Sequence, residues 1–238
     1  MKKPYISPRV SSFSAAGQMI ATVGLAATLS ACAMNRYTTP RTIPVGEVSH
    51  TVSVSMPVHP VSVPVPRYEA RVGLSERVDA GFRPGLLGMD ADLKYNFLRG
   101  PDLDMAIDPS VGYYYLYVPF GGQLNIFQST LPLMIAFHPE KSASIYAHGG
   151  IQADYLHAIY GGGSANEWWI LSASAGLGVQ IRTSKDFAVS PEIGITIPFS
   201  RTIYQHSDRD YQQDFTLIAG IGFNLGAQPS YADVGTSK

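Results

Sequence analysis

The fold of this chain is decided by a stretch near its C-terminal end, which reads FAVSPEIGITIPF (residues 187–199). Its odd-numbered positions are all apolar, whereas its even-numbered positions hold Ala, Ser, Glu, Gly, Thr and Pro. Such period-two alternation is typical of a β-strand with two different faces. The segments 169–181 and 214–225 alternate in the same way. These runs are longer than the five or six residues usual in soluble strands and reach the roughly 9–11 residues of a membrane-spanning strand.

Weaker alternation extends from these segments back to about Glu47. The sequence therefore predicts an all-β fold, a single antiparallel up-and-down transmembrane β-barrel of about ten strands, an even number that places both chain ends on one side. The first strand is the least regular, and the prolines that follow it make 57–66 an extended loop in our interpretation, because Pro cannot donate to a strand ladder. If that segment is not a strand, an eight-stranded barrel is the alternative. The expected strands are 47–56, 67–74, 77–84, 88–98, 104–117, 124–137, 143–159, 167–182, 186–199 and 213–225.

The connections between these strands alternate between short turns and longer loops, and 200–212 is the most polar loop. Short turns on one side and long loops on the other are typical of outer-membrane barrels. Aromatic residues gather beside the longer loops and predict an interfacial girdle, with a soluble β-protein that has an aromatic core as the alternative. These residues are Tyr113, Tyr114, Tyr115, Tyr117, Phe120, Tyr160, Trp168, Trp169, Tyr204 and Tyr211.

The composition agrees with a membrane barrel. The chain has 238 residues, enough for one barrel domain, and only 15% of them are charged, against roughly 25% in soluble domains. The net charge of −1 gives no basic footprint for nucleic acid. Cys32 is the one cysteine, so an intramolecular disulfide or a cysteine-rich metal site is excluded.

The N-terminal region has the features of an export signal. Lys2 and Lys3 precede an apolar stretch from about Met19 to Leu29 that is too short to span a bilayer. The tetrapeptide Leu29-Ser30-Ala31-Cys32 resembles the lipobox of bacterial lipoproteins, which implies cleavage before Cys32 and lipidation of that residue. An ordinary signal peptide cut nearby is the alternative. We expect a lipoprotein signal peptide in 1–31, a lipidated tether in 32–46, the barrel in 47–225 and a periplasmic tail in 226–238.

As a whole, the chain resembles the small bacterial outer-membrane β-barrel proteins, here in a lipid-anchored form. One local motif matches: Gly220-Ile221-Gly222-Phe223-Asn224-Leu225 has the spacing of the final strand that the barrel-assembly machinery reads. Ile218 and the thirteen residues that follow Leu225 depart from that pattern. The resemblance implies outer-membrane lipid and the lipoprotein-processing and barrel-assembly machinery as partners, and a location in the bacterial outer membrane.

If the apolar face contacts lipid, the opposite face supplies the lumen. A barrel of eight to ten strands is filled by side chains, and buried charges must be paired. We expect a salt-bridged, closed lumen, with an ion path or a binding cavity as the alternative. The lumen residues are Glu69, Arg71, Asp79, Arg83, Asp90, Asp92, Lys94, Asp108, His148, Asp154 and Glu192.

No spacing matches a catalytic motif, a metal site or a cofactor site, so we expect no catalytic residues, metal or cofactor. The cluster His206, Asp208 and Asp210 in the most polar loop is the candidate for binding a surface partner. The favoured function is a structural or surface-interaction barrel without an open pore. The alternatives are a barrel enzyme active at the rim, either a protease or a lipid-modifying enzyme, and a soluble lipid-tethered β-protein that binds an apolar ligand.

Overall fold

The computed structural model describes residues 35–59, 64–85, 87–118, 122–140, 142–159, 165–204 and 215–229. No helix in these residues is long and apolar enough to cross a membrane. Their regular structure consists of strands, whose bounds are β1 Val48–His59, β2 Val65–Ser75, β3 Val78–Gly85, β4 Gly88–Arg99, β5 Leu103–Ile107, β6 Ser110–Val118, β7 Gly122–Glu140, β8 Ala143–Ile159, β9 Ala165–Ser184, β10 Phe187–Tyr204 and β11 Thr216–Gly226.

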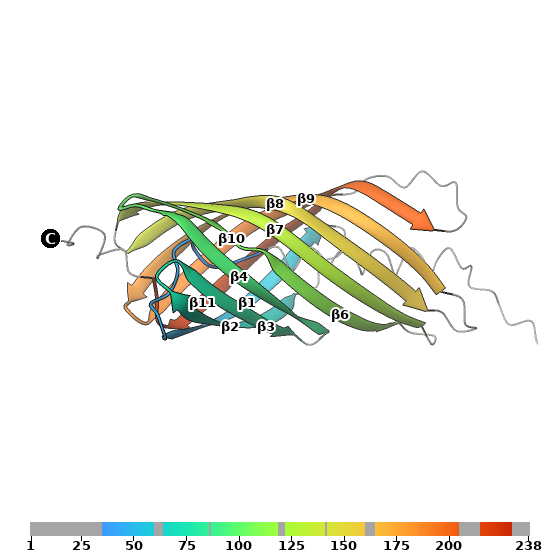
Figure 1. Cartoon of the computed structure of the whole chain (residues 1–238), viewed down its shortest axis with the longest axis horizontal. Helices are drawn as coiled ribbons and strands as arrows, with labels where there is room; N and C mark the ends of the chain where they lie inside the picture. Colours follow the sequence, from blue (N-terminus) through green and yellow to red (C-terminus); the bar gives the residue numbers. More distant parts are fainter. Residues whose placement is uncertain are drawn as a thin grey trace, which may run out of the picture.

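The strands form one closed antiparallel barrel (Figure 1). Apart from β5 and β6, each strand pairs with its neighbours in sequence, and β1 pairs with β11 from Ser49–Gly226 to His59–Leu217, which closes the sheet. β5 and β6 are two halves of one wall strand, because both pair with β4 on one side and with β7 on the other. The eleven strands therefore occupy ten positions in the wall. This confirms the predicted ten-stranded barrel, and the eight-stranded alternative is wrong.

The region around the prolines differs from the expectation. β1 continues through Pro57 to His59, and β2 already begins at Val65, so the loop predicted for 57–66 is shorter. Pro57 lies beside Ile218 of β11, where the register shifts between Pro57 and His59. A bulge of this kind tolerates a residue that cannot donate to the ladder.

The two faces of the wall differ as the alternation predicts. On β7, Phe127, Leu131 and Phe137 lie outside and are 51–58% exposed, whereas Gln128 and Thr130 lie inside and are buried. The outward positions of β8 and β11 carry no Asp, Glu, Lys or Arg, and on β7 the exposed acid is Glu140 at the turn end. The barrel therefore presents an apolar outer surface around a largely polar interior.

The expected aromatic girdle is only partly correct. Directly opposed aromatic side chains on β6–β9 form an outer row, with centroid separations of 4.9 Å for Tyr113–Phe127 and 5.0 Å for Tyr155–Trp169. Tyr114 and Trp168 do not belong to it, because neighbouring residues of a strand point to opposite faces. Trp168 is 2% exposed and packs inside the barrel in an apolar cluster with Leu116, Leu124, Ile126, Leu156 and Ala158.

The two ends of the barrel differ in shape. We call the end with the short connections at 76–77, 100–102, 141–142 and 185–186 the turn end, and the opposite end the loop end. Strands β7–β10 have 17 to 20 residues, whereas β2–β4 have 8 to 12. At the loop end, on the right in Figure 1, the long strands project beyond the short ones. The wall is consequently low at β2–β4 and high at β7–β10.

Candidate functional site: the barrel lumen

The lumen contains a segment of the chain's own N-terminal region. Residues 35–44, which we call the lumen segment, lie inside the barrel, and Arg36, Thr39 and Arg41 are 0–1% exposed. In Figure 1 this segment is the blue trace inside the strands next to the turn end. The sequence predicted a lipidated tether for 32–46, and the structure places residues 35–44 of it in the lumen. The physical reason is that the polar and basic side chains of the segment find acidic partners in the wall.

At the turn end, the lumen segment is joined to β2. Val45 forms a parallel bridge with Gly73, and the Gly46 N–H donates to the Gly73 carbonyl at 2.9 Å. Gly73 allows this close approach, since a Cβ there would lie 2.2 Å from the Pro44 oxygen. Any larger residue at this position would push the lumen segment away from the wall.

Arg41 provides the first charged contact. Its Nε and Nη2 lie 2.7 and 3.0 Å from the two oxygens of Asp104, and Nη2 also donates to the Gly100 carbonyl at 2.5 Å. His138 Nε2 lies 2.7 Å from the same carboxylate. Neither Arg41 nor Asp104 has an exposed side chain. A bidentate, charge-assisted pair of this kind is among the stronger polar contacts in proteins.

Further into the barrel, two wall side chains hold the backbone of the lumen segment. Lys94 Nζ donates to the carbonyls of Thr39 and Arg41 at 3.0 and 3.1 Å, and Asn96 Nδ2 donates to that of Pro40 at 3.1 Å. The Lys94 ammonium also pairs with Asp79 at 3.2 Å. Because the segment has no strand partners along this stretch, these side chains satisfy its buried carbonyl groups.

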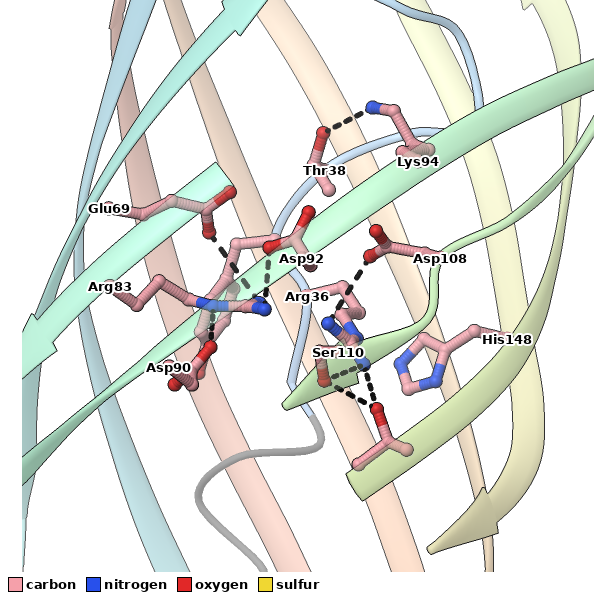
Figure 2. Close-up of polar contacts among 12 residues, drawn as sticks. Arg36, Thr38, Glu69, Arg83, Asp90, Asp92, Lys94, Asp108, Ser110 and His148 are labelled. Atoms are coloured by element: carbon pink, nitrogen blue, oxygen red, sulfur yellow. Dashed lines mark hydrogen bonds and ion pairs between the residues drawn. The ribbon is translucent and has the colours of Figure 1, made fainter. Parts of the chain in front are cut away.

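Arg36 provides the second charged contact, near the middle of the barrel. Its guanidinium lies 3.2 Å from Asp108 and donates to Thr130 Oγ1 at 2.6 Å and to Ser110 Oγ at 3.4 Å (Figure 2). On the other side of the lumen, the carboxylate of Glu192 accepts the backbone N–H groups of Arg36 and Tyr37 at 3.0 and 2.8 Å.

Glu192 also organises part of the wall. Its carboxylate accepts the hydroxyl of Tyr146 at 2.8 Å and lies 2.9 Å from His148 Nε2. Gly178 and Gly176 leave the space that Tyr146 and His148 occupy, since a Cβ at either glycine would lie 2.2–2.3 Å from the facing ring. Glu192 therefore connects two wall side chains and the lumen segment through one buried carboxylate.

Small residues on β10 and β11 leave room for the lumen segment. A Cβ at Gly222 would lie 2.6 Å from the Cβ of Tyr37, and a Cβ at Gly220 would lie 1.9 Å from its hydroxyl oxygen. That hydroxyl is hydrogen-bonded to Ser55 at 2.6 Å. The wall is thus lined with charges on β2–β6 and with small residues on the side that faces Tyr37.

The charged side of the wall is a continuous network. Arg71 contacts Glu69 at 2.9 Å, Asp92 at 2.6 Å and Asp79, while Arg83 contacts Asp92 at 2.6 Å and Asp90. Arg67 adds a second cation beside Asp90 at 2.8 Å. Figure 2 shows Arg83, Asp90, Asp92 and Glu69 gathered beside Arg36 of the lumen segment. Each buried charge here has an opposite partner, as a low-dielectric interior requires.

Every lumen residue named from the sequence lies inside the barrel and is at most 7% exposed. The network brings together Glu69, Arg71, Asp79, Arg83, Asp90, Asp92 and Lys94, whereas Asp108, His148 and Glu192 surround the lumen segment. Asp154 lies apart and accepts from Gln128 and Gln152 at 2.9 and 2.6 Å. Arg36, Arg41, Asp104 and His138 were missed, although Arg36 and Arg41 are the charged residues of an otherwise neutral stretch, 33–46.

Other sequence predictions lie outside the described residues. They include the lipidation site Cys32, the loop candidates His206, Asp208 and Asp210, and the girdle aromatics Phe120, Tyr160 and Tyr211. Among the residues that the structure does describe, no group of three or more His, Cys, Asp or Glu side chains could hold a metal ion.

The lumen segment changes the charge balance of the interior. Within the described wall, eight buried acids face three buried Lys and Arg side chains and the nearly buried Arg67. These acids are Glu69, Asp79, Asp90, Asp92, Asp104, Asp108, Asp154 and Glu192. Arg36 and Arg41 supply two further cations, placed against Asp108 and Asp104. The segment therefore both fills the space and neutralises part of the acidic lining.

No protein-family profile matches the chain. No curated protein matches it in sequence either. Among solved structures it is similar to Ail, the attachment invasion locus protein of Yersinia pestis, with 10% identity and a TM-score of 0.43 over 76% of this chain and 95% of that one. Neisserial surface protein A has 10% identity and a TM-score of 0.38 over 75% and 95% of the two chains. The outer membrane protease OmpT from Escherichia coli has 9% identity and a TM-score of 0.42 over 76% and 92%.

Proposed function

We propose that this protein is a bacterial outer-membrane β-barrel whose lumen is closed by its own lumen segment and whose role is to present surface loops to a partner. In this proposal it is anchored by lipid at Cys32 and forms no open pore. The observation that carries the closed lumen is the position of residues 35–44, which are held by Arg41–Asp104, by Lys94 and by Arg36–Asp108.

The outer surface supports the membrane location. Its strands carry exposed apolar side chains such as Leu131, Ile151 and Ile193, which are 49–58% exposed. A continuous apolar surface of this kind is costly in water and suits contact with lipid chains. The outer aromatic row at Tyr113, Phe127, Tyr155 and Trp169 suits the bilayer interface.

The closed lumen is tested by conductance in planar bilayers. We expect the purified protein to give no large, steady conductance steps, and the double variant Arg36→Ala/Arg41→Ala to conduct cations in preference to anions, since Asp108 and Asp104 then lack their arginine partners. Large, steady steps with the unmodified protein would contradict the closed lumen. The matched control is Arg77→Ala, which removes an exposed arginine from the turn end.

The surface role is tested by shortening the polar segment of sequence that follows β10. Deleting Gln205–Tyr211 should leave the barrel resistant to SDS until it is boiled while removing binding to its surface partner. Peptidase or lipase activity that is lost on His206→Ala or Asp208→Ala would replace this proposal with that of an enzyme active at the rim.

A further inference from the structure

The lumen segment has a direction, which follows from the order of its contacts. Thr42 Oγ1 donates to the Glu76 carbonyl at 2.7 Å, and Arg41 donates to the Gly100 carbonyl, so these residues lie at the turn end. β4 runs from Gly88 at the loop end to Arg99 at the turn end. Along this strand, Pro40 is held by Asn96 and Thr39 by Lys94. Lower residue numbers in the segment therefore lie further from the turn end.

The contacts with β7 show how far along the barrel the lumen segment reaches between Arg41 and Arg36. Asp104, which holds Arg41, contacts His138, whereas Arg36 contacts Thr130. Eight residues of strand separate His138 from Thr130, which is about 26 Å at 3.3 Å per residue, or roughly 20 Å along the axis at the usual tilt of barrel strands. Five residues, from Arg41 to Arg36, span at most about 17 Å, and the two long arginine side chains add to that reach. The segment therefore runs along the barrel axis, with bends at Thr38, Pro40 and Arg41, and Arg36 lies deeper in the lumen than Arg41.

The path back to the turn end is blocked. Cys32 precedes Asn35 by three residues, which reach about 10 Å at most. The turn end lies farther away than this, and the space on the way is filled by residues 36–44 and by the side chains that hold them.

The path toward the loop end is short on one side. Asp90, which belongs to the network beside Arg36, is only two residues from Gly88, where the low wall ends. Two residues of strand are about 7 Å long. Along β4, the level of Asp90 and of the Arg36 guanidinium beside it is therefore only about 7 Å from the low rim.

We propose that the chain passes through its own barrel, so that the residues before Asn35 emerge at the loop end and the mature N-terminus lies on the cell-surface side. Acyl chains carried by Cys32 then enter the outer leaflet at the loop end, and the partner of the N-terminus is the lipid of that leaflet. The lumen contacts give the direction of the chain within the barrel. Which end of the barrel faces the cell surface rests on the orientation in the proposed function.

The test is an insertion of about twenty flexible residues with an epitope between Ala33 and Met34 of the full chain. Twenty residues extend to about 66 Å, so the insert is longer than the barrel is tall and must emerge at one end. The same insert between Ser184 and Lys185, at the turn end, is the matched control. We expect antibody to bind intact cells that carry the first insert, and to bind the second only after the outer membrane is permeabilised.

Two outcomes separate the inference from the proposed function. If both inserts bind antibody only after permeabilisation, threading from the loop end is wrong and the barrel orientation stands. If the turn-end insert binds on intact cells, the proposed orientation itself is wrong.

A second measurement, made on the protein with the insert, tests whether the lumen segment still lies against β11. Its variant Tyr37→Cys/Gly222→Cys should form a disulfide that mass spectrometry detects, since the two Cβ positions are 2.6 Å apart and a small shift brings them to disulfide distance. Failure to form this disulfide under oxidising conditions, with the barrel folded, would overturn the inference.

Discussion

The guanidinium of Arg41 and the carboxylate of Asp104 form a bidentate pair, with N–O distances of 2.7 and 3.0 Å and no exposed side-chain surface on either residue. The two residues are 63 positions apart in sequence. The contact therefore fixes the N-terminal region inside a barrel that is built from the rest of the chain.

Arg41→Ala should destabilise the folded protein by about 3–5 kcal/mol, because it leaves the buried carboxylate of Asp104 without its guanidinium partner. The double variant Arg41→Met/Asp104→Leu should lose less, since it removes both charges together and leaves apolar groups of similar volume. The free energy of unfolding in urea, measured on protein folded in detergent micelles, checks both. Equal losses for the single and the double variant would contradict a net role for the pair.

The two faces of β10 can be tested at adjacent positions. Ile195→Arg places a charge on the lipid face and should cost roughly 2–4 kcal/mol near the bilayer midplane. Thr196→Arg points into the lumen, where the wild-type side chain is 5% exposed, and should act by crowding instead. Cysteines at the same two positions should differ in labelling by a lipid-phase probe, with strong labelling at 195 only. Equal labelling would argue against a membrane barrel.

Gly222→Ala should destabilise the protein through a clash with Tyr37, because the new Cβ would lie 2.6 Å from the Cβ of that residue. Overpacking of this kind typically costs about 1–3 kcal/mol. Tyr37 has a φ of 49°, a region that favours glycine. Tyr37→Gly therefore removes the clashing atom and suits the backbone.

The loss from Gly222→Ala should accordingly be much smaller in the Tyr37→Gly background, and a double-mutant cycle on the unfolding free energy measures this coupling. Additive losses would mean that Tyr37 does not lie against β11.

Lipidation is tested by Cys32→Ala, which should abolish acyl labelling and processing by the lipoprotein signal peptidase. One acyl chain alone binds a membrane only marginally, so the barrel should dominate membrane attachment. Given an ordinary signal peptide, the Cys32→Ala protein should still fractionate with the outer membrane. Acyl labelling that persists in this variant would show that the lipid is attached elsewhere.

Most of the barrel could be predicted because strand formation leaves a local signal. The side chains of a strand alternate with period two, so Ile195 and Thr196 are assigned to opposite faces from sequence alone. The same rule assigns Trp168 to the inside, opposite Trp169, whereas its position beside a loop suggests the outer girdle.

The lumen segment could not be predicted from such local signals. It has no regular period, and the contacts that hold it join residues far apart in sequence, such as Tyr37 with Glu192 and Arg36 with Thr130. A short basic stretch with two prolines is equally compatible with a flexible tether. Only the acids that the closed wall brings together decide between the two.

The position of β1 has a consequence for biogenesis. β1 starts at Val48, only four residues after the lumen segment ends, and it is also the strand that seals the barrel against β11. The two partners of that seam are about 170 residues apart, and contacts of such long sequence separation form late and slowly. When β1 reaches β11, it brings residues 35–44 to the interior by its own attachment to them. Sealing the wall and filling the pore are then one event, so that an intermediate with an empty, conducting barrel need not exist during insertion.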